Sequence, residues 1–241
     1  MGENCQNCAQ VVIGNFCSNC GQNSTFERID KNYAKNEFLN LIGYEKGFLY
    51  TFKELLLRPT TNISTYLKTN RNKLTKPLTF LILSSVIYTL VVNYLQIAIE
   101  NEEKFKEIYG NSSIITIFNW IQGNYGYANI LMLLFVAFWT NIFFRKYKFN
   151  FYEVIVILCF VVGESMLLLS IEPIISKYFK IPILSSAIYW LVFAYISFAI
   201  GSVFERKFSS YLKAFSAYII GMFTFGILAS IIAIIYDTII K

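Results

Sequence analysis

The sequence predicts an all-α integral membrane protein: about five transmembrane helices, preceded by a small four-cysteine zinc ribbon and by amphipathic cytosolic helices. Three observations lead to this fold class. Of the 241 residues, 56% are hydrophobic and only 15% are charged, whereas an ordinary soluble domain has about 25% charged residues. Apolar stretches in the last two thirds of the chain are long enough to cross a bilayer. Four of the five cysteines lie within the first 20 residues, in two C-x2-C pairs.

The charges divide the chain into parts that suit different solvents. Residues 1–77 hold 10 of the 21 Lys and Arg residues and 6 of the 15 Asp and Glu residues. We therefore expect a zinc-ribbon module over residues 1–26, cytosolic amphipathic or interfacial helices over 27–77, and a five-span membrane domain over 78–241. The first apolar stretch is too short for the core of a signal peptide, so we expect the N-terminus to be retained.

The N-terminal cysteines form the most specific local motif. Cys5 and Cys8 make one C-x2-C pair and Cys17 and Cys20 make the other, with eight residues between the pairs. This spacing allows two tight turns to present four thiolates to one tetrahedral Zn²⁺. Residues 11–13, between the pairs, are predicted to form a short strand that is followed by a turn.

Two alternatives compete with zinc at this motif. Two disulfides would require export of the segment, which the missing signal peptide and the charge distribution oppose. A redox-active site would need only one C-x2-C pair, followed by a strand–helix pattern that is not seen here. With cysteine at all four positions, no coordination site is left open for water or substrate, so a bound zinc would be structural.

The composition also restricts the chemistry and the partners. Histidine is absent, which removes the usual near-neutral acid–base group and argues against most hydrolases. Residues 1–26 contain no Lys or Arg, so binding of a nucleic acid through its phosphates is not expected. A cytosolic protein is the expected partner of the zinc module.

Five apolar stretches are long enough for a hydrocarbon core of about 30 Å, which takes about 20 helical residues. They lie near residues 78–99, 128–144, 151–171, 181–204 and 214–236. The start of the second stretch is the least certain boundary, because glycines and an asparagine precede it. The fifth cysteine, Cys159, lies within the third stretch and is expected to behave as a small buried hydrophobe.

The basic residues of the connecting loops predict the orientation. The loops after the second and fourth stretches carry three Lys or Arg residues each, and those after the first and third carry two each. With the ten in residues 1–77, this bias places the N-terminus in the cytoplasm and the C-terminus outside, in a multi-pass protein of the cytoplasmic (inner) membrane. The lipid bilayer is then an obligatory partner, and a homo-oligomer is left open.

The segment before the first span carries an amphipathic pattern. A helical stripe of apolar residues precedes Pro59 and consists of Phe48, Leu49, Phe52, Leu55 and Leu56. Residues 60–77 then contain Lys68, Arg71, Lys73 and Lys76 and no acidic residue. Two interpretations stay open: these helices lie in the cytosolic interface with the basic patch on anionic lipid headgroups, or they pack over the cytosolic ends of the bundle.

Two acidic residues lie inside the third predicted span. Glu153 and Glu164 are eleven residues apart, which places both on one face of a helix. Glu153 is close to the basic loop before the span, so we expect an interfacial salt bridge. Glu164 lies near mid-span, where an ionised carboxylate facing lipid costs about 3 kcal/mol. It is either a functional group in a water-filled cavity or a neutral carboxyl hydrogen-bonded to a residue such as Asn93 or Asn141.

Several short motifs resemble one bacterial family. Along the chain they are Gly14-Asn15-Phe16-Cys17-Ser18-Asn19-Cys20-Gly21-Gln22, Gly47-Phe48-Leu49-Tyr50-Thr51, Leu55-Leu56-Leu57-Arg58-Pro59, Tyr66-Leu67, Asn70-Arg71 and Lys76-Pro77 with Phe80-Leu81. This order resembles domain of unknown function 3667 over roughly the first third of the chain. The resemblance implies a zinc ribbon joined to several membrane spans, and it implies no activity, because none is assigned to the family.

Three classes of function fit these features. We favour a non-enzymatic scaffold or trafficking-type membrane protein whose zinc module binds a cytosolic partner. An oligomeric channel, a transporter or a membrane-acting effector is the alternative, although five spans do not divide into the two equal halves of an inverted-repeat transporter. A membrane lipid enzyme ranks last, because the sequence shows no cluster of His, Ser or acidic residues near the interface.

Overall fold

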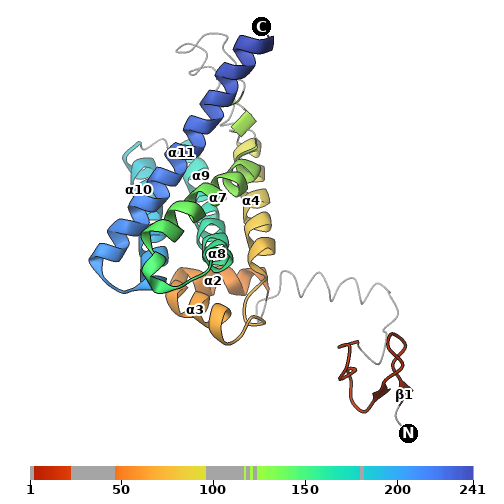
Figure 1. The fold of residues 1–241 in the computed structure, drawn as a ribbon. Coiled ribbons are helices and arrows are strands. Elements are labelled where there is room, and N and C mark those ends of the chain that lie inside the picture. The colour runs from red at the N-terminus through yellow and green to blue at the C-terminus, as the bar shows by residue number, and fades with distance from the viewer. Residues whose placement is uncertain are drawn as a thin grey trace. The chain divides into compact units, whose positions relative to one another are not determined.

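A computed structural model of the protein describes residues 3–22, 47–95, 117, 120–121, 124–179 and 182–240. The chain forms two compact units, Met1–Gly43 and Tyr44–Lys241. We call residues 3–22 the N-terminal module and the second unit the helical unit, and each is described by itself (Figure 1).

The N-terminal module contains two short strands and two turns. β1 (Glu3–Asn4) pairs antiparallel with β2 (Val11–Val12), with Glu3 opposite Val12. The buried core of the module consists of Cys5, Val12 and Cys17. So small a core cannot offset the conformational entropy lost when a chain this short folds, so a cross-link or a metal is needed to hold it.

Two short helices begin the described part of the helical unit. α2 (Phe48–Leu57) is followed directly by α3 (Pro59–Lys68), so that Arg58 both ends the first helix and precedes the second. Pro59 occupies the first position of α3, where its missing N–H costs no hydrogen bond. The proline therefore starts one helix as well as ending the other.

Further helices follow in the described residues. They are α4 (Pro77–Tyr94), α7 (Tyr125–Phe143), α8 (Phe151–Leu169), α9 (Ile171–Phe179), α10 (Pro182–Phe204) and α11 (Phe208–Ile240). A 3-10 turn, η1 (Arg145–Tyr147), lies between α7 and α8. Figure 1 shows α11, in blue, extending well beyond α7 toward the C-terminus.

The central helix of this unit is α8. It packs against α4, α7 and α10, and it also contacts α2 and α3. Of an 18-residue apolar stretch in the span that contains α8, 67% is buried inside the protein, against 28% or less for the corresponding stretches of the other candidate spans. Asn150 and Glu153 start the helix with a capping box, and residues 157–166 are then buried without a break.

Four helices in the described residues are long and apolar enough to cross a membrane. They are Pro77–Tyr94, Phe151–Phe179, Ile183–Phe204 and Phe208–Ile235. The predicted span near 128–144 corresponds to the apolar part of α7, Tyr127–Phe143, which is shorter than these four helices. The mostly helical, membrane-type architecture is therefore confirmed, and the fifth span stays a prediction.

The predicted span boundaries follow the helices only approximately. The third predicted span, 151–171, is shorter than the observed apolar stretch, because Ser170 between α8 and α9 keeps helical backbone angles (φ −64°, ψ −15°). The fifth predicted span, 214–236, lies inside the longer α11. The last residues of the first predicted span, 96–99, lie outside the described residues.

The inner faces of α2 and α3 belong to the core of the helical unit. Phe48, Leu55, Ile63 and Tyr66 are buried in the same cluster as the residues of α8, and the ring of Tyr66 packs edge-on against Phe160, with centroids 5.1 Å apart. On another face of α2, an exposed apolar surface consists of Leu49, Leu56 and Leu57. The helices thus pack over the bundle, as one of the two interpretations expected, and keep an outer apolar surface.

α3, the last turn of α10 and the loop after α7 come together at one end of the helical unit. Thr60 and Ser202 share a hydrogen bond that links α3 to the last turn of α10, and the ring of Phe149 packs edge-on against Phe204. Figure 1 shows α2 and α3, in orange, at this end. We call it the basic end and define it by α2, α3 and residues 145–150 and 205–207.

Two glycines allow helices to approach closely. At Gly221 of α11, a Cβ atom would lie 2.7 Å from the Cα of Val136 in α7, and at Gly163 of α8 one would lie 3.3 Å from the Cα of Leu81 in α4. Further along α11, a Cβ atom added at Gly226 would have no atom of a neighbouring helix within 4 Å. The backbones of α7 and α11 therefore touch at Gly221, as small residues permit between membrane helices.

Candidate functional site

The four N-terminal cysteines lie on two turns with the same hydrogen bonds. In the first turn the N–H of Ala9 donates to the carbonyl of Cys5, and in the second the N–H of Gly21 donates to the carbonyl of Cys17, both at 2.8 Å. Ala9 (φ 60°) and Gly21 (φ 73°) directly follow the second cysteine of each pair and both adopt the left-handed conformation. This repeat turns both C-x2-C pairs toward one point.

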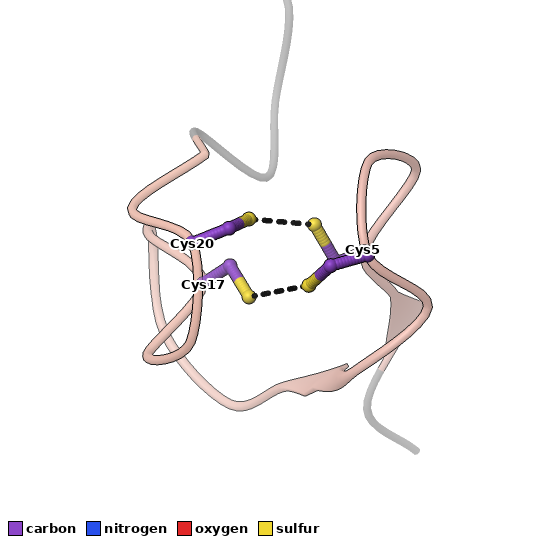
Figure 2. Close-up of side chains that lie close together, drawn as sticks. Cys5, Cys17 and Cys20 are labelled. Atoms are coloured by element: carbon purple, nitrogen blue, oxygen red, sulfur yellow. Dashed lines mark hydrogen bonds between the residues drawn. The ribbon is translucent and has the colours of Figure 1, made fainter.

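The sulfurs form one cluster. The Sγ atoms of Cys5 and Cys20 are 3.5 Å apart, and so are those of Cys8 and Cys17, whereas a disulfide bond is about 2.05 Å long. All four are free thiols, and their sulfurs lie within 4.8 Å of one another. Figure 2 shows the labelled Cys5, Cys17 and Cys20 pointing inward. The four cysteines could hold one metal ion.

The backbone of the turns favours thiolates at two of these positions. The N–H groups of Asn7 and Cys8 lower the pKa of Cys5, and the N–H of Gln10 and the side chain of Asn19 lower the pKa of Cys8. Thiolates, not thiols, are the metal-binding form.

Ionisation of Cys20 next to the other three sulfurs requires a cation. At Cys20 the N–H of Gln22 lowers the pKa, but burial and the sulfurs of Cys8, Cys5 and Cys17 outweigh it and raise the pKa to about 11. The thiolate at Cys20 is therefore unfavourable until a cation neutralises the cluster.

Outside this cluster, the N-terminal module exposes apolar side chains. Val11 is 50% exposed, Ile13 is 98% exposed and Phe16 is 63% exposed. They come from β2 and from the segment between the two cysteine turns. The module therefore presents apolar surface to its surroundings, although it buries very few residues.

The four predicted basic-patch residues are not equivalent. Lys68, Arg71 and Lys76 are exposed, but the Nζ of Lys73 donates to Asn62 Oδ1 at 2.7 Å and lies 3.8 Å from Glu54 Oε2. The amide of Asn62, which is 1% exposed, donates to Glu54 as well. Lys73 is therefore part of an internal polar network that fastens α3 to α2.

The sequence analysis did not predict this polar network of Glu54, Asn62 and Lys73. Its one available signal is that Glu54 is the only acidic residue between positions 46 and 99. An acid kept alone in a basic, apolar segment needs a partner when it is partly buried. The partner, however, depends on how α2 and α3 fold back on each other.

A second polar cluster at the basic end surrounds Glu205. Its carboxylate pairs with Lys207, accepts a hydrogen bond from the hydroxyl of Tyr147 and lies 3.5 Å from the Nζ of Lys146. The Lys207 and Tyr147 hydrogen bonds lower the pKa of Glu205 to about 2. Glu205 is therefore ionised at any physiological pH and ties the loop after α7 to the loop after α10. The sequence analysis did not select Glu205 or Tyr147.

The two acids of the third predicted span have different environments. Glu153 Oε2 accepts the backbone N–H of Asn150 at 2.9 Å, which closes the capping box of α8; the contact shown is a helix cap and not the expected salt bridge. Glu164 is fully buried, and neither of its carboxylate oxygens has a hydrogen-bond partner among the described residues. The candidates Asn93 and Asn141 are exposed and half-buried, respectively.

This isolation of Glu164 leads to a prediction. A buried polar group without a partner costs about 1–3 kcal/mol, so Glu164→Met, which removes the polar atoms at similar volume, is expected to raise the melting temperature of the purified protein in detergent. Glu164→Gln, which keeps a buried polar group, is expected to leave it nearly unchanged. A lower melting temperature for Glu164→Met would show instead that the carboxyl is hydrogen-bonded in the protein.

Comparison with known proteins adds one finding. A family model described as "Protein of unknown function (DUF3667)" matches residues 45–89. The match supports the family resemblance. The matched residues cover α2, α3 and the first part of α4, and so contain the whole Glu54–Asn62–Lys73 network. No curated protein and no solved structure matches the chain.

Proposed function

We propose that the chain is a bacterial inner-membrane protein with five spans that displays a zinc-stabilised module in the cytosol as a docking site for a protein partner. The observation that carries the proposal is the four-cysteine cluster in a compact unit of its own, with apolar side chains on its outside. In this role the protein acts as a scaffold and catalyses no reaction.

The geometry of the sulfurs supports zinc. Four ligands at a Zn–S distance of about 2.3 Å in a tetrahedron are about 3.8 Å from one another. The two closest pairs are 3.5 Å apart and all pairs are within 4.8 Å, so a tetrahedral ion fits after small adjustments. Four thiolates favour zinc over the hard cations, and they leave no open position, which supports a structural role.

The surface of the module supports a protein partner. Val11, Ile13 and Phe16 are exposed apolar residues in a module whose buried core has only three residues, and aromatic side chains such as that of Phe16 are enriched at protein–protein interfaces. The absence of Lys and Arg in residues 1–26 leaves no cationic side chain to neutralise phosphates.

The arrangement of the helical unit supports five spans. α7 has 19 residues, which makes it about 28 Å long and close to the hydrocarbon thickness of about 30 Å. The loops that follow α7 and α10 meet at the basic end, as five alternating spans require. Their Lys and Arg residues favour the cytosolic side for this end.

The first part of the test concerns orientation. With five spans the two termini lie on opposite sides of the membrane, and with four they lie on the same side. A periplasm-active reporter fused after Lys241 is expected to be active, and a cytosol-active reporter at the same position is expected to be silent. The opposite pattern would rule out five spans with a cytosolic N-terminus.

The second part concerns docking. A photo-crosslinking residue at Ile13 is expected to give one discrete protein adduct in cells, and Phe16→Ser is expected to weaken it while the metal content stays the same. The control is the same crosslinker at Gln6, an exposed polar position on the first cysteine turn. Equal adducts at both positions, or none at Ile13, would contradict a specific docking surface.

A further inference from the structure

A cleft of about 370 Å³ opens at the basic end of the helical unit. It lies between the end of α3, the residues that connect η1 to α8, the first turn of α8 and the last turn of α10. Its walls consist of Leu67, Lys68, Tyr147, Lys148, Phe149, Glu153, Val203 and Phe204. Segments far apart in the sequence therefore build one site, and the sequence analysis did not predict it.

Charged groups of both signs line this cleft. Lys68, in the last turn of α3, and Lys148 are exposed and supply two ammonium groups. Lys148 directly follows η1 in the left-handed conformation (φ 56°). The carboxylate of Glu153 uses Oε2 for the capping box, and a carboxylate accepts hydrogen bonds at both oxygens. The lining thus offers two cations and one anion to a ligand.

A second part of the wall is apolar and is held in place by ring contacts. Phe204 stacks on Phe144 with centroids 4.1 Å apart, and Phe149 packs edge-on against Phe204 at 5.1 Å. Leu67 and Val203 complete this wall. A ligand that fits both walls carries a phosphate-like anion, a cation a few bonds away and an apolar portion.

We propose that this cleft binds the phosphoethanolamine headgroup of a glycerophospholipid. Lys68 and Lys148 contact the phosphate diester, Glu153 accepts a hydrogen bond from the ammonium group, and the glycerol and the first acyl carbons lie against Phe149, Phe204 and Val203. Basic pockets between membrane helices at the headgroup level are recognised lipid sites. The inference goes beyond the scaffold role, and it requires only that the basic end meets a bilayer surface, whichever side that surface faces.

The carboxylate decides between lipid classes. A phosphatidylglycerol headgroup brings the phosphate but no cation, so it offers Glu153 only neutral hydroxyl donors and no charge-assisted contact. Phosphatidylcholine brings a cation that has no N–H to donate. Of these three lipids, only phosphatidylethanolamine brings both a phosphate for the lysines and an ammonium N–H for the carboxylate.

The experiment uses the full chain, stripped of lipid in detergent and titrated with the three lipids of identical acyl composition, with binding read by native mass spectrometry. The wild-type protein is expected to bind phosphatidylethanolamine more tightly than either of the others. The double variant Lys68→Gln/Lys148→Gln is expected to weaken binding about tenfold or more, because it removes two charge-assisted contacts. Glu153→Gln keeps the capping box and is expected to abolish the preference for phosphatidylethanolamine over phosphatidylcholine.

The matched control is Arg71→Gln/Arg145→Gln. It removes the same charge, at exposed positions that do not line the cleft, and is expected to bind as the wild type does. If both double variants weaken lipid binding equally, the lipid binds a diffuse basic surface and not the cleft. A wild-type preference for phosphatidylglycerol would exclude the Glu153 contact. If the melting temperature shows that the double variant is misfolded, the single variants Lys68→Gln and Lys148→Gln carry the same comparison against Arg145→Gln.

Discussion

Replacing Cys17 by serine is expected to reduce the zinc content of the purified protein from about one ion per chain to none, and to unfold the N-terminal module. Cys17 is 2% exposed and belongs to a core of three residues. Structural zinc supplies about 10–16 kcal/mol in small zinc-binding peptides, far more than such a core provides. Loss of one ligand therefore removes most of the free energy that keeps the module folded.

The measurement is elemental analysis of the full chain in detergent under reducing conditions, together with limited proteolysis of residues 3–22. Cys159→Ala is the control, because Cys159 is buried in α8, outside the cysteine cluster; this variant should retain about one zinc per chain. Metal-free wild-type protein, or full zinc content in Cys17→Ser, would contradict the assignment.

Replacing Gly221 by alanine is expected to destabilise the helical unit by about 1–3 kcal/mol, the usual cost of overpacking a tight site. The new methyl group would lie 2.7 Å from the Cα and 2.9 Å from the backbone N of Val136. Backbone atoms cannot rotate away as a side-chain end can, so α7 and α11 must separate. The expected readout is a melting temperature lowered by several degrees in detergent.

The same substitution at Gly226 provides the control. It lies in the same helix, and its Cβ position has no atom within 4 Å. Alanine also favours a helix over glycine by about 1 kcal/mol, so Gly226→Ala is expected to be neutral or slightly stabilising. Equal losses at both positions would mean that helix flexibility, and not the α7–α11 contact, determines the effect.

Features that depend on short sequence distances could be predicted. The spacing of Cys5, Cys8, Cys17 and Cys20 restricts the turns on which they lie, and the structure gathers the four sulfurs. Long apolar stretches likewise predicted five spans, and four of these predictions correspond to helices that are long and apolar enough to cross a membrane. Such a prediction sums hydrophobicity over many residues, so single polar residues do not change it.

Features that depend on contacts between distant segments could not be predicted from the sequence. Tyr147 and Glu205 are 58 residues apart, and nothing local marks them as partners. The amphipathic stripe of α2 was compatible with lipid and with protein as its neighbour, because both present an apolar surface to Leu55 and Leu56 alike. The structure distinguishes the two residues: Leu55 is fully buried in the protein, and Leu56 is 42% exposed.

The length of α11 has a consequence for the bilayer around the protein. Its apolar stretch, Phe208–Ile235, has 28 residues and extends about 42 Å, while about 20 residues span a hydrocarbon core of about 30 Å. Near its end, Ile231, Ile234 and Ile235 are half-exposed, so an upright helix would push apolar side chains into water. Hydrophobic mismatch of this kind is relieved by tilt or by local thickening of the membrane. The protein should therefore partition toward thicker bilayers, and its helix tilt should increase as the surrounding lipids shorten.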